Sequence, residues 1–177
     1  MVISVDGVHC RTYEARKNPT AKVYSHKTHG PGVAYELGIA VYENRLVWIN
    51  GPFHASTHDI TIFRGEAERM FPNPNDPSER ESLKSKLSDG QRAVADGGYK
   101  GEAPGKTVVA REGHSKEVTN HLNRIRARHE SFNGRLKGFR ILAETFRHGK
   151  EKHQTVFEAG CVLIQYDLEN GHPLMEV

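Results

Sequence analysis

Three carboxylates in this sequence have the spacing and surroundings of a metal-binding set: Asp6, Asp96 and Glu130. Asp6 and Asp96 each follow a short apolar stretch and precede a glycine, so both are expected at strand ends, where loops build sites on open α/β sheets. Carboxylate oxygens are hard ligands, which Mg²⁺ and Mn²⁺ prefer. Two such ions can activate a water or a 3′-hydroxyl and stabilise the leaving oxygen of a phosphodiester displacement. No nucleophilic side chain is needed for this chemistry.

Each of these acids also has a simpler interpretation. An Asp before a glycine is commonly only a turn residue, and Glu130 can pair with Arg126 at i, i+4 on a helix. Three acids together, at two strand ends and on one helix, are harder to explain in this way. We therefore treat Asp6, Asp96 and Glu130 as the candidate catalytic and metal-binding residues.

The element that must carry Glu130 is a long helix predicted over 116–140, because apolar side chains recur there at alternating three- and four-residue steps. The core stripe contains Leu122, Ile125, Phe132, Leu136 and Phe139, with His129 filling the gap. A second stripe beside it contains Arg126, Glu130, Asn133 and Lys137. One acid thus lies among cations at the rim of the core, and the position of Arg126 and Lys137 suits contacts with phosphates.

The remaining pattern predicts an α/β fold with a mixed sheet. Strands are expected over 2–12, 35–42, 45–50, 92–95 and 107–110, and helices over 60–70, 116–140 and 155–166. The first three strands form an antiparallel meander, with a two-residue link at 43–44. Residues 13–30 are expected to be irregular, with Gly30-Pro31-Gly32 as breakers, and 71–78 to be a surface loop.

Composition sets limits on the class of protein. The 177 residues suit a single domain over 1–177. Lys and Arg total 25 against 22 Asp and Glu, a net charge of +3 that alone does not establish nucleic-acid binding, but basic residues outnumber acids over 111–152. Two distant cysteines favour neither a disulfide framework nor a zinc site. With no apolar run of membrane-spanning length and no signal peptide pattern, we expect an intracellular protein, nuclear if the host is a eukaryote.

Four segments together resemble the signatures of the DDE transposases, specifically the Harbinger or PIF type of DDE endonuclease domain. They are Val5-Asp6-Gly7-Val8-His9, then Gly51 with His58-Asp59-Ile60-Thr61-Ile62-Phe63, then Ala95-Asp96-Gly97-Gly98-Tyr99, and RARHESFNGRLK from Arg126 to Lys137. The resemblance covers nearly the whole chain. Arg126, Glu130 and Lys137 also match the Arg, Glu and Lys of a signature in related insertion-sequence enzymes, although Asn123 stands where those enzymes have a tyrosine.

The resemblance implies an RNase H-like fold and a cut-and-paste transposon endonuclease and strand transferase that acts on DNA. It assigns the triad to Asp6, Asp96 and Glu130, with Mg²⁺ or Mn²⁺, as two ions, for the cofactor. Family members usually carry an upstream helix-turn-helix region, whereas this chain starts at the first catalytic strand, which is typical of a truncated relic, a gene-model fragment or a stand-alone domain. A homo-oligomer or a separate DNA-binding partner protein is a candidate partner, besides DNA itself. The alternatives are an inactive or domesticated DNA-binding remnant and a structural-RNA nuclease of the same fold.

Several other residues have two interpretations. His9 and Tyr99 are candidates to line a substrate cleft, the alternatives being a surface position for His9 and packing under the turn for Tyr99. Asp59 follows a helix start and is expected to stabilise the first-turn dipole rather than to join the triad. Trp48 is expected in the core.

Overall fold

The computed structural model describes residues 2–14, 21–73, 75–77, 81–110 and 113–177. Its strands are β1 (Ile3–Arg11), β2 (Tyr24–Ser25), β3 (Gly30–Ala40), β4 (Leu46–His54), β5 (Ala93–Ala95) and β6 (Thr107–Val109). Its α-helices are α1 (Asp59–Arg64), α2 (Leu83–Lys86), α3 (Lys116–Gly138), α4 (Arg140–Ala143) and α5 (His153–Glu169). Short 3₁₀ helices are η1 (Ala21–Val23), η3 (Gly97–Glu102) and η4 (Lys150–Lys152).

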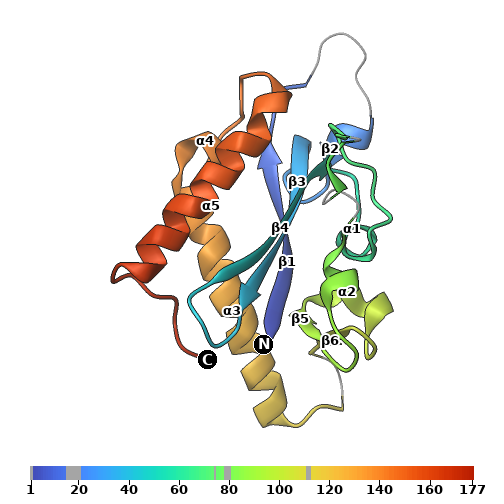
Figure 1. Cartoon of the computed structure of the whole chain (residues 1–177), viewed down its shortest axis with the longest axis vertical. Helices are drawn as coiled ribbons and strands as arrows, with labels where there is room; N and C mark the ends of the chain where they lie inside the picture. The colour runs from blue at the N-terminus through green and yellow to red at the C-terminus, as the bar shows by residue number, and fades with distance from the viewer. Residues whose placement is uncertain (1, 15–20, 74, 78–80, 111–112) are drawn as a thin grey trace.

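The strands form one mixed sheet in the order β4, β3, β1, β5, β6, and β2 pairs with the beginning of β3. The pairs β1–β3 and β3–β4 are antiparallel, whereas β1–β5 and β5–β6 are parallel. Helices α3 and α5 lie on one side of this sheet and α1 and α2 on the other (Figure 1). The predicted mixed α/β sheet flanked by helices, with an antiparallel meander at its start, is confirmed.

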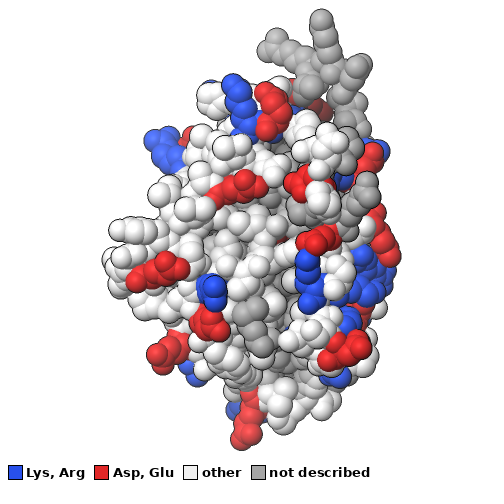
Figure 2. Space-filling model, in the orientation of Figure 1, with Lys and Arg blue, Asp and Glu red and all other residues white. Residues whose placement is uncertain are grey.

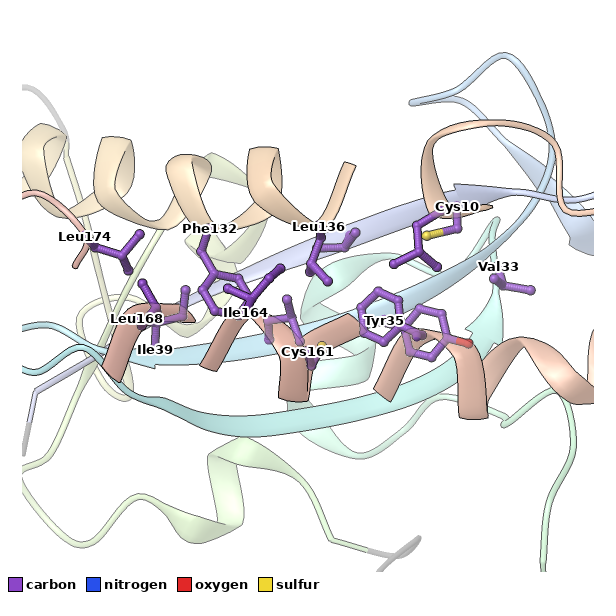
Figure 3. Close-up of a cluster of buried hydrophobic side chains, with 14 residues drawn as sticks. Cys10, Val33, Tyr35, Ile39, Phe132, Leu136, Cys161, Ile164, Leu168 and Leu174 are labelled. Carbon is purple, nitrogen blue, oxygen red and sulfur yellow. The ribbon is translucent and has the colours of Figure 1, made fainter. Parts of the chain in front are cut away.

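The core on the α3 and α5 side follows from the alternation of side chains along β1 and β3. Cross-strand partners Val8 and Tyr35 point to this side and pack against Phe132 and Leu136 of α3. Helix α5 closes the cluster with Cys161, Ile164 and Leu168 (Figure 3). The predicted apolar stripe of the long helix is therefore the surface that holds α3 against β1.

The opposite side of the sheet has a second apolar cluster, which contains Ile3, Val5, Phe63, Leu83, Leu87, Ala93, Ala95, Tyr99 and Val109. Its members come from β1, α1, α2 and the residue after it, β5, η3 and β6. Because β1 contributes to both clusters, it is buried on its two sides at the centre of the sheet.

Element boundaries differ from the prediction in several places. Residues Gly30-Pro31-Gly32 begin β3 rather than end a loop, and the Pro31 carbonyl accepts from the Thr12 amide, a bond that needs no proline N–H. Helix α1 stops at Arg64 because Gly65 adopts a left-handed conformation with φ 78°. The link between β3 and β4 spans residues 41–45 instead of 43–44, and α5 extends to Glu169.

None of the helices in the described part of the chain has the length and apolar character required to cross a membrane.

Candidate active site

Asp6, Asp96 and Glu130 line one small pocket together with Arg126 and His129. The fold explains why residues this far apart in sequence meet. Strand β1 runs parallel to β5, so Asp6 on β1 and Asp96 after β5 lie on neighbouring strands. Helix α3 packs across β1 and supplies Glu130. Ser4, Val5 and Val94 complete the lining.

Asp6 is partly buried and held by two hydrogen bonds. Its Oδ1 accepts from the Gly7 amide at 2.8 Å, and its Oδ2 accepts from Asn133 Nδ2 at 2.9 Å. Burial raises the pKa of Asp6 to about 6, the charges of Asp59 and Asp96 add to this effect, and Lys27 and the Gly7 amide oppose it. A carboxylate that is costly to ionise in this way favours a nearby cation.

Asp96 is placed by the turn that follows β5. Its side chain caps η3 by accepting a hydrogen bond from the Gly98 amide at 2.8 Å. The simple turn interpretation of this Asp-Gly-Gly sequence is thus correct for one oxygen, Oδ1. The same carboxylate also lines the pocket, so Asp96 can both cap the turn and take part in a site.

Glu130 and Arg126 lie one turn apart on α3, yet their side chains form no ion pair or hydrogen bond with each other or with any described residue. The alternative interpretation of Glu130 as a helical salt-bridge partner therefore finds no support in the geometry. Glu130 is exposed and Arg126 partly buried, and both line the pocket with charges available to a ligand.

Two charged residues near this pocket were not predicted to take part, Asp59 and Lys27. The Asp59 carboxylate approaches β1 so closely that a Cβ added at Gly7 would collide with its Oδ1. Lys27 Nζ donates to Asp59 Oδ2 at 2.8 Å. Asp59 does begin α1, as expected, but its carboxylate binds Lys27 instead of only serving the helix dipole. The His-Asp motif was the one sequence signal that pointed to it.

The two candidate cleft residues lie outside the pocket lining. Tyr99 is fully buried and packs edge-on against Phe63, with ring centres 5.7 Å apart. It therefore packs under the turn, the second of its two interpretations. His9 is buried rather than at the surface, and its Nδ1 lies 2.9 Å from Ser25 Oγ. Trp48 packs against the core and donates to Glu36 at 2.9 Å.

Several of the basic side chains of α3 form hydrogen bonds within the protein. The Lys137 ammonium donates to the His9 and Leu142 carbonyls and contacts Cys10 Sγ. Arg128 donates to the carbonyls of Ala40, Glu43 and Met175. On the face drawn in Figure 2, the described Lys and Arg side chains are interspersed with Asp and Glu. A phosphate-binding role for Lys137 stays a prediction. The internal contacts of its ammonium argue against that role.

The donor set around the pocket fits a hard divalent cation by its chemistry, since Asp6, Asp96 and Glu130 offer only carboxylate oxygens. In the part of the chain that the structure describes, no three His, Cys, Asp or Glu side chains lie close enough to form a ready cluster for an ion. Mg²⁺ commonly takes one or two carboxylates and completes its shell with water and substrate phosphates. The pocket residues fit that mode of binding.

Comparison with known proteins gives one match. The family model described as DDE superfamily endonuclease matches residues 5–165. No curated protein and no solved structure matches the chain. The matched segment includes all three pocket carboxylates and most of both core clusters. With the family model covering most of its length, this chain belongs to the DDE superfamily endonucleases.

Proposed function

We propose that this chain is the catalytic domain of a cut-and-paste transposase of the Harbinger or PIF type. In this proposal it cleaves DNA at transposon ends and transfers the 3′-hydroxyl to target DNA. The observation that carries the proposal is the pocket, because three carboxylates from β1, the β5 end and α3 line it within a matched endonuclease segment. The proposal includes a homo-oligomer or a separate DNA-binding partner, and action in the nucleus if the host is a eukaryote.

Each pocket residue has a role that its chemistry allows. Asp6, Asp96 and Glu130 would hold Mg²⁺ or Mn²⁺. When bound, such ions lower the pKa of a coordinated water and stabilise charge on the leaving oxygen. Asn133 orients Asp6 through its hydrogen bond to Oδ2. Arg126 lines the same pocket with an unpaired guanidinium among the described residues, which suits a phosphate oxygen of the substrate strand.

The test is nicking of supercoiled plasmid in the presence of Mg²⁺ or Mn²⁺. We expect the wild type to nick, and Asp96→Asn and Glu130→Gln to lose nicking by at least ~10²-fold, because each removes a charged metal ligand. Asp167→Asn, an acid on α5 that pairs with Arg135 outside the pocket, is the control and should retain activity.

Two outcomes would redirect the proposal. If the wild type binds duplex DNA but does not nick it with either metal, the chain is a DNA-binding remnant. If Glu130→Gln nicks like the wild type, the assignment of Glu130 is wrong. Parallel incubation with structured RNA distinguishes a DNA nuclease from an RNA nuclease of the same fold.

A further inference from the structure

Lys27 is held beside the acidic pocket by a turn with several anchors. The turn at residues 26–29 joins β2 to β3. At its start, Ser25 Oγ lies 2.9 Å from His9 Nδ1 and accepts from the Thr28 amide at 3.2 Å. At its end, the Thr28 carbonyl accepts from Arg11 Nη2 at 3.1 Å. Because two β1 side chains hold the turn, Lys27 is fixed over β1 rather than free in solvent.

The partner of Lys27 is a carboxylate that is nearly buried. Asp59 has 9% of its side chain exposed, and Lys27 has 48%. Burial alone would raise the pKa of Asp59, but contacts with His9 and Lys27 lower it below its usual range. Asp59 therefore carries a negative charge that the Lys27 ammonium balances at 2.8 Å.

Both members of this pair act on the carboxylates of the pocket. Asp59 and Asp96 flank the same glycine, since a Cβ at Gly98 would lie 3.5 Å from Asp59 Oδ2 and 3.0 Å from Asp96 Oδ1. The Asp59 carboxylate also lies against Gly7, the residue after Asp6, where an added Cβ would collide with its Oδ1. Although burial opposes it, the pKa of Lys27 is raised by Asp59, with smaller contributions from Asp6 and Asp96. Lys27 and Asp59 thus influence the pocket with opposite sign.

We propose that Lys27 and Asp59 together set the affinity of the acidic pocket for a divalent cation. Lys27 is a resident positive charge that lowers this affinity. Asp59 raises it, both by its own charge and by balancing the charge of the ammonium. The inference rests on the proposed function, since it takes Asp6 and Asp96 as metal ligands. A structural ion pair, the competing interpretation, would make loss of either partner disturb the pocket in the same direction.

The experiment is calorimetric titration of the full chain with Mn²⁺ in the absence of DNA, at low ionic strength to limit screening. Lys27→Met should bind Mn²⁺ roughly three- to tenfold more tightly, as expected for removing a nearby unit charge from the surroundings of a divalent ion in a water-like dielectric. Asp59→Asn should bind it more weakly by a similar factor. The double variant restores the net charge and should return to within about twofold of the wild type.

The matched controls are Lys86→Met and Glu81→Gln. These residues form an ion pair at 2.6 Å, and Lys86 has the same 48% side-chain exposure as Lys27. This pair lies at α2, whereas Lys27 is paired with Asp59 beside Gly7 and Gly98. Both controls should bind Mn²⁺ within about twofold of the wild type, because exposed charges farther away are screened.

Shifts of Mn²⁺ affinity in the same direction for Lys27→Met and Asp59→Asn would overturn the inference, as would no shift in either. If neither Lys27→Met nor Lys27→Gln folds, the pair is a structural requirement and the inference is also wrong. In each of these cases the wild type can still bind Mn²⁺ and nick plasmid, so the proposed function stands. A wild type that binds no Mn²⁺ would overturn both.

Discussion

On helix α3, cations a few residues apart serve different purposes because they lie at different depths. Arg128 is buried and bonds to backbone carbonyls near the end of β3 and in the C-terminal segment. Lys137 donates to carbonyls that belong to β1 and α4. Arg126, which lines the pocket, keeps its guanidinium free of protein partners among the described residues. Of these three cations, Arg126 is the one that we propose binds a phosphate.

This difference predicts opposite outcomes for two variants in DNA binding. Arg126→Gln should flatten the dependence of log affinity on log salt by about 0.7 to 0.9, the change expected when one fewer phosphate is neutralised by the protein. Lys137→Met should leave that slope unchanged and lower the free energy of unfolding by about 1–3 kcal/mol, because carbonyls near the core lose their donor. Binding to an arbitrary duplex with Ca²⁺, across a salt series, measures the slope, and urea unfolding measures stability. A flattened slope for Lys137→Met alone would reverse the two assignments.

Between elements, the start of α1 lies directly against β1 beside the site. Gly7 on β1 lacks the Cβ that would collide with the Asp59 carboxylate at the first position of α1. The carboxylate is also fixed by Lys27 and cannot simply rotate away. Gly7 therefore allows the helix start, the strand and the β2–β3 turn to meet beside the pocket.

Gly7→Ala should lower the free energy of unfolding by about 1–3 kcal/mol, since overpacking forces a backbone or side-chain shift. In a double-mutant cycle measured by urea unfolding, Asp59→Ala should relieve part of this cost, because it removes the atom that the new methyl group meets. Gly134→Ala is the control: it lies on α3 with nothing within 4 Å of its added Cβ and should be neutral or stabilising by up to about 1 kcal/mol. Strictly additive effects of Gly7→Ala and Asp59→Ala would contradict this packing argument.

At the scale of the whole molecule, an acid is buried within the sheet, on the strand β3 beside β1. Glu36 on β3 is fully buried, and its Oε1 accepts from Trp48 Nε1 at 2.9 Å. Burial raises the pKa of Glu36 to about 8, with the Asp59 charge adding to this and the Trp48 hydrogen bond opposing it. The folded protein therefore keeps this proton at pH 7, whereas the unfolded chain releases it near its ordinary pKa of 4.5.

Because the folded state binds more protons between about pH 4.5 and pH 8, the contribution of Glu36 to stability falls as pH rises through this window. Glu36→Gln removes the titration and preserves the shape. The difference in unfolding free energy, variant minus wild type, should therefore increase by about 1–4 kcal/mol when the pH is raised from 5 to 8.5. Urea unfolding of both proteins at the two pH values measures the difference. A difference that does not change with pH would show that Glu36 does not titrate in this way.

The sequence determined the features that depend on local patterns. The period of its apolar residues fixed the long helix and its core stripe, and alternation fixed the central strands and the meander. The triad candidates were identified by their order along the chain, and Asp6, Asp96 and Glu130 do line one pocket. Their role in catalysis remains a prediction.

Only the tertiary structure decided what each charged group contacts. Lys27 and Asp59 are 32 positions apart and meet because the β2–β3 turn and α1 both pack at β1. Lys137 points inward because the carbonyl of His9, 128 positions away in sequence, lies within its reach. Residue type and helical period say which side of a helix a cation occupies, but not which distant backbone covers it. The partner of a long side chain is set by the packing of whole elements, and no local pattern encodes that packing.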